Sequence, residues 1–470
     1  MEEKKYLTGK SYLGYFLSSF GNNFGYYLVT TAAMLFMTDY MGMNAGIVGI
    51  LIAVSKVFDG VTDVICGTII QNTKSKLGRA RAWMLRMLLP MAVLQVLCFC
   101  IGKNWSDFAV YAYFFVTYLV FNAVLNTLYG IAYNTMPVFI TRNKGEQAKL
   151  SICNFGGGTV ASTVIASVYL VLIGSFGGDA AAWRTLAIIF GVIFVILEGI
   201  AILCMKELPP IETEKMKESE GRPLKQVMDN FKYLLSNRFF IYQLLIMIIY
   251  TASSSFFSVA LPYYAIYILQ DETVQGLISI SALGIIIGLF CSPALIKKMG
   301  IYKVNVASRI IGCFFGAGVI VGAFMRSVPV IMLCNALFYI CSGPYLGAVN
   351  PIIAEISAYS LRKDGVSIDA SVFSCNTMGT KVGQALGAAL VGWLLAAANY
   401  DGTLAVQPAS AETMIILLFA AAPAICNVIV TVLMALLNPE KANKKWDEEN
   451  PEAAAKIRAM IEAADQAAQK

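Results

Sequence analysis

The sequence contains no histidine among its 470 residues, and only 14% of its residues are charged. A soluble globular chain carries about 25% charged residues. The lack of histidine excludes triads, proton relays and metal sites that depend on imidazole. The eleven cysteines are scattered through apolar segments without paired spacing, which favours small packing residues over disulfides or metal ligands. No nucleophile–base pair stands out in the sequence, so we do not expect an enzyme.

Long apolar runs are what the sequence has in abundance. Hydrophobic residues make up 58% of the chain, and the mean hydropathy is +0.68. An apolar run of about 18 or more residues is typical of a helix that crosses the hydrocarbon core of a membrane. We therefore predict an all-α polytopic membrane protein with twelve transmembrane helices, over residues 11–38, 45–70, 83–102, 107–135, 149–175, 183–205, 238–269, 274–297, 303–325, 328–358, 369–398 and 412–437. The charge of +6 indicates no nucleic-acid partner.

A polar segment near the middle of the chain predicts two halves. It separates a six-helix bundle at 1–205 from a second six-helix bundle at 238–437, with a cytoplasmic linker at 206–237 and a cytoplasmic tail at 438–470. Apolar residues at helical spacing in 223–235 predict a short interfacial helix in the linker. Alanine-rich residues 452–469 predict a solvated helix, for which an inert tail is a better interpretation than a partner-binding one.

The positive charges in the short loops predict the orientation. Lysine and arginine concentrate after the second, fourth, eighth and tenth spans, at Lys74, Lys76, Arg79, Arg81, Arg86, Arg142, Lys144, Lys149, Lys297, Lys298, Lys303, Arg362 and Lys363. The opposite loops hold only Lys103, Arg184 and Arg326. Because cytoplasmic loops are enriched in these residues, we expect a multi-pass protein of the plasma (inner) membrane with both termini in the cytoplasm.

Three ionisable residues interrupt the second apolar run, in the stretch SKVFDGVTDVICG at 55–67. Asp59 and Asp63 are four residues apart and share a helix face, which Lys56 joins. Charges inside a membrane are costly and usually face a cavity where they function. A small cation between the carboxylates would relieve their repulsion, and the hydroxyls of Thr62 and Thr127 would complete an oxygen shell suited to Na⁺.

A structural ion-pair network is the alternative interpretation of the same charges. Lys381, in the middle of the eleventh span, needs an acidic partner, and Asp59 and Asp63 are the natural candidates. Both interpretations hold together if Lys381 leaves the carboxylates when a cation arrives, which would make it a switch. Glu198, in the sixth span, either faces a cavity or lies near a helix interface.

Polar residues in the other spans predict where a substrate binds. Asn22 and Asn23 are adjacent carboxamides in mid-membrane, and a polyol would supply the hydrogen-bond partners that they need. The expected substrate-binding residues are Asn22, Asn23, Tyr26, Tyr133, Asn134 and Lys381. We expect the basic loop with Lys74, Arg79 and Arg81 to close the cytoplasmic face against acidic residues such as Glu146 or Asp364.

Several motifs resemble those of one known family. They are FMTDYMG at 36–42, KVFDGVTDVICG at 56–67 with TKSKLGRARAW at 73–83, TRNKGEQAKLS at 141–151, SNRFF at 236–240 and GTKVGQALG at 379–387. From about residue 10 to residue 438 the sequence resembles the glycoside-pentoside-hexuronide:cation symporters, the melibiose-permease group of the major facilitator superfamily. The resemblance implies the major facilitator fold. It also implies a cation site at Asp59, Asp63, Thr62 and Thr127, with Lys381 and Lys56 close by.

The sequence departs from the melibiose-type members at the sugar site. Asn23 and Gly130 stand where those members have aspartates, in helix one and helix four. Asn134 stands where they have a tryptophan one turn after the helix-four aspartate, and Phe155 stands where they have an arginine in helix five. These differences imply a different substrate.

We therefore expect a monomeric secondary transporter without a bound cofactor. It would couple Na⁺ or H⁺ to the symport of a sugar or glycoside by alternating access. A cation-coupled transporter of a non-sugar such as a lysolipid, or an uncoupled uniporter or sensor, are the alternatives.

Overall fold

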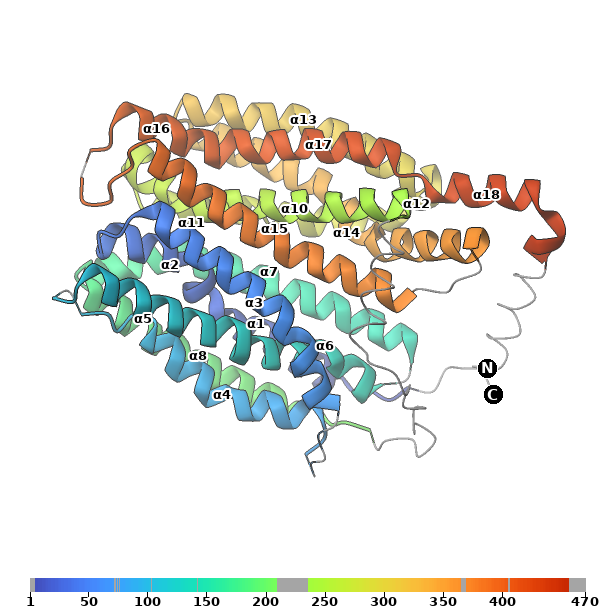
Figure 1. Ribbon diagram of the computed structural model, residues 1–470, viewed down its shortest axis with the longest axis horizontal. Coiled ribbons are helices and arrows are strands. Elements are labelled where there is room, and N and C mark those ends of the chain that lie inside the picture. Colours follow the sequence, from blue (N-terminus) through green and yellow to red (C-terminus); the bar gives the residue numbers. More distant parts are fainter. Residues whose placement is uncertain are drawn as a thin grey trace.

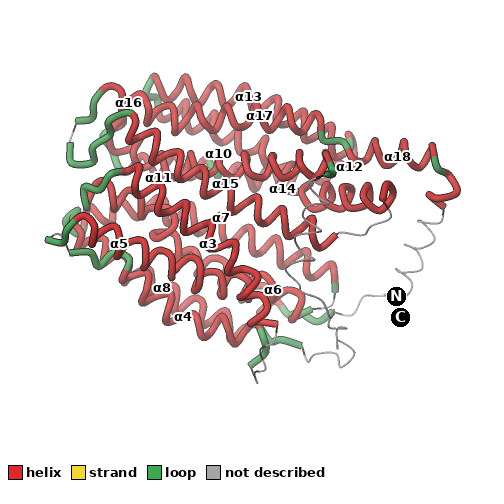
Figure 2. Tube along the Cα trace, viewed as in Figure 1, coloured by secondary structure: helices red, strands yellow, loops and turns green. Residues whose placement is uncertain are grey.

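The computed structural model describes residues 5–455 except 72, 74, 76, 103, 142, 209–235, 365–368 and 405. The side chains of some helical residues, Asp63, Lys144 and Asp364 among them, lie outside this description. The described residues form helices and connecting loops (Figure 2), as the sequence predicts. The predicted linker helix at 223–235 and most of the linker itself lie outside the described residues.

The described residues of the first half form eight α-helices and three short π-helical segments, written η. They are α1 (Gly9–Tyr27), η1 (Leu28–Ala32), α2 (Ala33–Leu35), η2 (Phe36–Tyr40), α3 (Ala45–Gln71), α4 (Ala80–Leu97), α5 (Asp107–Leu119), η3 (Val120–Asn126), α6 (Thr127–Ile140), α7 (Lys144–Ser175) and α8 (Ala180–Cys204).

The second half begins with α10 and ends with a helix beyond the last span. Its elements are α10 (Arg238–Tyr263), η4 (Tyr264–Leu269), α11 (Thr273–Ser281), α12 (Gly284–Met299), α13 (Ile301–Phe324), α14 (Val328–Asp364), α15 (Asp369–Ala397), α16 (Ala409–Ile416), η5 (Leu417–Ala421), α17 (Ala422–Leu436) and α18 (Pro439–Glu449).

Ten helices within the described residues are long and apolar enough to cross a membrane. The two remaining predicted spans correspond to residues 9–40 and to Ala45–Gln71, of which only Ala45–Lys56 counts as a shorter apolar helix. Both carry the polar residues that the sequence singles out, Asn22 and Asn23 in the first and Lys56 and Asp59 in the second.

The helices lie side by side in two groups (Figure 1), with α1 to α8 in the lower part of the view and α10 to α17 in the upper part. Within the first group α1 packs against α7 and α8, and within the second α10 packs against α15 and α17. The groups meet where α3 packs on α15 and α7 packs on α11. We call the left side of Figure 1, where α8, α11 and α16 begin, the α16 end, and the opposite side the α18 end.

Polar residues at the helix boundaries explain where several helices begin and end. Asp179 accepts backbone N–H bonds from the first turn of α8, and Asn237 does the same for α10. Such caps satisfy donors that have no partner inside the helix. Gly300 ends α12 with a φ of 85°, a conformation that costs glycine little.

Glycines bring the two groups of helices into close contact at the α16 end. A Cβ atom on Gly392 of α15 would lie 2.5 Å from the carbonyl oxygen of Ala45, and one on Gly276 of α11 would lie 2.8 Å from the Cα of Ser167. A Cβ on Gly402 would meet the carbonyl oxygen of Thr38 at 2.4 Å. The halves are therefore packed backbone to backbone at this end.

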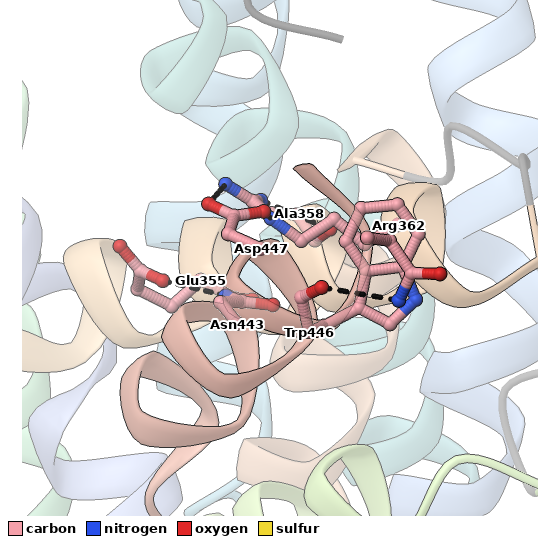
Figure 3. A network of polar contacts seen from close by, with 7 residues as sticks. Glu355, Ala358, Arg362, Asn443, Trp446 and Asp447 are labelled. Carbon is pink, nitrogen blue, oxygen red and sulfur yellow. Dashed lines mark hydrogen bonds and ion pairs between the residues drawn. The ribbon is translucent and has the colours of Figure 1, made fainter. Parts of the chain in front are cut away.

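The first residues of the predicted tail form α18, which packs against the end of α14 (Figure 3). Arg362 and Asp447 make a two-point ion pair, with N–O distances of 2.8 and 3.3 Å. Asn443 is buried and donates to the carboxylate of Glu355 at 2.7 Å. Residues 438–449 are thus docked rather than free, and the predicted alanine-rich helix lies mostly outside the described residues.

Candidate functional site

The buried carboxylate of Asp59 lies at the contact between the two halves. Its Oδ2 is 3.3 Å from Nζ of Lys381 on α15, which forms an ion pair across the contact. Its Oδ1 accepts a hydrogen bond from the hydroxyl of Thr127 at the start of α6. Only 5% of Asp59 is exposed. One carboxylate thus joins three helices from both halves.

A π-helical segment explains how Thr127 reaches Asp59. Residues Val120–Asn126 form η3, and Thr127 follows directly. Its hydroxyl also lies 3.0 Å from the carbonyl oxygen of Asn122, five residues earlier, an acceptor that an unbroken α-helix would not offer at that spacing. The wider turn places Thr127 where its hydroxyl meets Asp59 of α3.

The remaining predicted cation-site residues lie on α3 beside Asp59. The hydroxyl of Thr62 donates to backbone carbonyls of its own helix, at 3.0 Å to Asp59 and 3.3 Å to Phe58. Lys56 lies one turn before Asp59 and is partly buried. The side chain of Asp63 lies outside the described residues. Asp59, Thr127 and Lys381 are therefore the predicted residues whose side chains the structure brings into contact.

Asp59 and its neighbours can hold either a lysine or a small hard cation. Carboxylate, hydroxyl and carbonyl oxygens are the ligands that Na⁺ prefers, and a carboxylate also binds a proton. Lys381 satisfies Asp59 with a full positive charge at 3.3 Å. A cation that binds Asp59 competes with this ammonium group, because both neutralise the same carboxylate.

The predicted substrate residues on α1 are less accessible than the sequence suggests. Asn23 is buried, accepts a hydrogen bond from Ser162 at 2.7 Å and donates to the carbonyl of Ser19 at 2.8 Å. It therefore ties α1 to α7. Asn22 is only partly buried, but its Oδ1 atom is buried and makes no hydrogen bond to protein. Tyr26 is partly buried.

Tyr133 and Asn134 face different surroundings. Tyr133 is stacked on Tyr15 with ring centroids 4.6 Å apart, and its hydroxyl bonds to Oδ1 of Asn154 at 3.1 Å. Asn134 is exposed. Asn154, which the sequence analysis did not select, also accepts a bond from Ser19. The sequence signal that could have indicated Asn154 was a carboxamide within an apolar span, as for Asn22.

In the loop predicted to form the cytoplasmic gate, the backbone of two arginines contacts an acidic residue that was not among the expected partners. The backbone N–H groups of Arg79 and Arg81 donate to the carboxylate of Glu207 at 2.8 and 2.7 Å. Glu207 follows α8, at the start of the predicted linker. Lys74 and the side chain of Asp364 lie outside the described residues.

Glu146, the other expected gate partner, accepts bonds from Tyr6, Leu7 and Thr141. Burial raises the pKa of Glu146, but the hydrogen bonds from these three residues outweigh burial and leave the pKa below its usual value. The carboxylate is therefore charged at neutral pH. It fastens the segment before α1 to the start of α7.

A second carboxylate joins the halves at the α16 end. Asp39, in η2, accepts hydrogen bonds from Tyr400 at 2.5 Å and from Tyr267 at 2.8 Å. The neighbouring Thr38 shares a hydrogen bond with Tyr263 at 2.9 Å. Asp39 lies in the motif FMTDYMG, but nothing in the sequence indicates a role for it. Its tyrosine partners come from the other half of the chain, so only the fold reveals them.

Stacked apolar spans in two groups, with the Asp59–Lys381 ion pair at the contact between them, define a multi-pass membrane transporter. The arrangement matches a crystal structure of a mutant of the nucleoside transporter NupG with a TM-score of 0.63, over 90% of this chain and 98% of that one, at 14% sequence identity. The major facilitator fold is therefore confirmed. The chain belongs to the family described as MFS/sugar transport protein, whose model matches residues 14–440.

Curated relatives cover most of the chain. The isoprimeverose transporter of Lactiplantibacillus pentosus is 27% identical over 390 residues, which is 82% of this chain and 80% of that protein. The inner membrane symporter YicJ of Escherichia coli is 25% identical over 438 residues, 91% of each chain. The putative glycoside/cation symporter YagG of Escherichia coli is 26% identical over 436 residues, 92% of each chain. These relatives confirm the resemblance to glycoside:cation symporters that the motifs predicted.

Proposed function

We propose that the protein is a secondary active transporter that couples the entry of a cation, Na⁺ or H⁺, to the symport of a sugar or glycoside. The observation that carries the proposal is the contact of Asp59 with Lys381 and Thr127 between the two halves. A buried carboxylate that joins both halves can sense a cation and change how the halves meet. The family and the names of its relatives support transport of a sugar.

The proposed coupling follows from competition for Asp59. With no cation present, Lys381 neutralises Asp59 and holds α15 against α3. A cation bound by Asp59 and Thr127 releases Lys381, which then offers its ammonium group to substrate hydroxyls. Binding of the cation favours the state to which the substrate binds, and binding of the substrate favours the state to which the cation binds. This reciprocal free energy couples their transport.

The proposed substrate site lies on the face of the first half that carries carboxamides. Asn22 has an unpaired carbonyl oxygen, and Asn134 is exposed. A Cβ on Gly130 would have nothing within 4 Å, so space is open beside it. These groups form hydrogen bonds without charge, which suits a neutral polyol. Asn23 and Tyr133 would shape the site from behind, because both are held by neighbouring helices.

The substrate class is tested by counterflow into proteoliposomes with a panel of radiolabelled glycosides, pentosides and uronides. We expect exchange of at least one glycoside, with melibiose and simple galactosides as poor competitors. The reason is that Asn23 and Gly130 lack the carboxylates that make charge-assisted hydrogen bonds, worth about 1.5–3 kcal/mol each. Tight competition by melibiose would contradict this assignment of the sugar site. If no compound of the panel exchanges, a sugar or glycoside is excluded as the substrate.

We also propose that the α18 end faces the cytoplasm. In a variant with Cys291 replaced by serine, an impermeant thiol reagent outside sealed cells should label a cysteine at Val406 and not one at Lys445. Val406 is 74% exposed beside the start of α16, and the side chain of Lys445 is 73% exposed on α18. Labelling at Lys445 in intact cells would reverse the orientation.

With that orientation, close contacts between the halves lie on the outer side. The glycine contacts and the hydrogen bonds of Asp39 all lie at the α16 end. Transport would then require these contacts to break and re-form in each cycle.

A further inference from the structure

A buried arginine lies inside the second half, away from the charges at Asp59. Arg309, on α13, is only 2% exposed. Its Nη1 atom donates to Oδ1 of Asn427 at 3.0 Å and to the hydroxyl of Ser342 at 3.4 Å. Its guanidinium lies over the rings of Tyr250 and Tyr345, with centroid distances of 5.1 and 5.3 Å.

The positive charge of Arg309 has no negative partner among the described residues. The ionisable side chains that act on it are tyrosines and cysteines, namely Tyr250, Tyr345, Cys313 and Cys341, which are neutral at neutral pH. Its Nε and Nη2 atoms make no hydrogen bond. Cation–π contacts with two rings offset only part of the cost of burying a charge.

Arginine cannot remove this cost by losing its proton, since it stays charged in proteins. Glu198 shows the contrast. It is also fully buried, in the first half, where it accepts a hydrogen bond from Ser18 at 2.8 Å and has one oxygen without a partner. A carboxyl can take up a proton and become neutral. A guanidinium needs an anion.

A cavity with a volume of about 100 Å³ adjoins Arg309 within the second half. The side chains with hydrogen-bond donors that line it include Ser253 and Ser254 of α10 and Asn335 and Tyr339 of α14. The hydroxyl of Ser342 also lines it but donates to the carbonyl of Phe338. Sites for drug-sized ligands have volumes of about 300–1,000 Å³. This cavity is too small for a glycoside, but it has room for one small ion with a few waters.

We propose that this cavity binds a small monovalent anion, with chloride as its most abundant form, as the counter-charge of Arg309. Hydroxyl and amide groups donate hydrogen bonds to the anion, and the low dielectric of the bundle strengthens its attraction to the guanidinium. The anion would hold α10, α13, α14 and α17 together, because the lining residues come from all four helices. This site is separate from Asp59, and the proposal rests on no part of the coupling mechanism.

The test measures binding of ³⁶Cl⁻ and thermal unfolding of the purified full chain, at constant Na⁺ and ionic strength, in chloride or in gluconate. We expect saturable binding of one chloride per chain and a thermal midpoint several degrees higher in chloride. Arg309→Gln should lose both effects. Tyr339→Phe removes a lining hydroxyl and keeps the ring, so it should keep the fold and bind chloride severalfold more weakly, which keeps the test valid if Arg309→Gln does not fold.

Arg326→Gln is the matched control, since Arg326 lies just beyond the end of α13 but is exposed and paired with Glu412. It should bind chloride as the wild type does. Three results would overturn the proposal. The wild type could bind no chloride and unfold at the same temperature in both salts, or Arg309→Gln could retain saturable binding. A uronate could displace ³⁶Cl⁻ at lower concentration than chloride itself, which would assign the cavity to the carboxylate of a substrate.

Discussion

Asp59→Asn is expected to abolish gradient-driven accumulation while substrate exchange continues. The change keeps the size of the side chain and an oxygen that can accept from Thr127, but it removes the charge that Lys381 and the cation share. Without a coupled ion, transport can only equilibrate the substrate, so the accumulation ratio should fall to about one. The measurement is uptake into vesicles under an imposed Na⁺ or H⁺ gradient, compared with counterflow without a gradient.

The same change leaves Lys381 without this carboxylate, so stability must be measured beside transport. Removing one partner of a buried ion pair costs about 3–5 kcal/mol, and less here because 22% of the Lys381 side chain is exposed. Asp447→Asn is a suitable control, since it breaks the Arg362 ion pair at the α18 end without touching the proposed site. Gradient-driven accumulation at the wild-type level in Asp59→Asn would contradict a role in coupling.

Gly392→Leu is expected to slow turnover about 5–150-fold. A Cβ at this position would lie 2.5 Å from the carbonyl oxygen of Ala45 and 2.7 Å from the terminal methyl of Met34. Overpacking of this kind costs about 1–3 kcal/mol, and the cost falls only on the state in which the halves meet at the α16 end. The variant should therefore populate the state that is open at that end.

The population shift can be followed with a cysteine at Gly130, where space is open. An impermeant reagent applied at the α16 end should label it faster in Gly392→Leu than in the wild-type background. Gly199→Leu is the matched control, because a Cβ there would meet nothing within 4 Å. Equal turnover in both leucine variants would show that close contact at Gly392 does not limit the cycle.

The features that follow from composition and periodicity were predictable from the sequence. Long apolar runs predicted the helices and their approximate bounds. The reason is that a helix satisfies its own backbone N–H and C=O groups, which have no water to bond to in lipid. Asp59 and Lys381 stood out because charges are rare in such runs, and their pairing follows from the need to neutralise them. The hydroxyl of Thr127 was assigned to the same site as an oxygen ligand, and the motif resemblance supported this assignment.

Contacts that depend on irregular helix geometry or on side-chain direction were not predictable. Nothing in the sequence indicates that η3 turns Thr127 toward α3, because π-helical segments have no reliable local signature. Asn23 looked like a substrate ligand, yet Ser162 on a distant helix satisfies it. Arg309 was not selected, since its isolation from every described carboxylate appears only when the helices are packed.

The most direct test of the account is concentrative uptake by the double variant Asp59→Asn with Lys381→Met. This variant removes both charges of the ion pair at once, so neither charge is left without the other. If Asp59 binds the coupling cation, the double variant should exchange substrate in counterflow but accumulate none under a Na⁺ or H⁺ gradient. If the pair only locks the helices together, the double variant should recover gradient-driven accumulation, and that recovery would contradict the account.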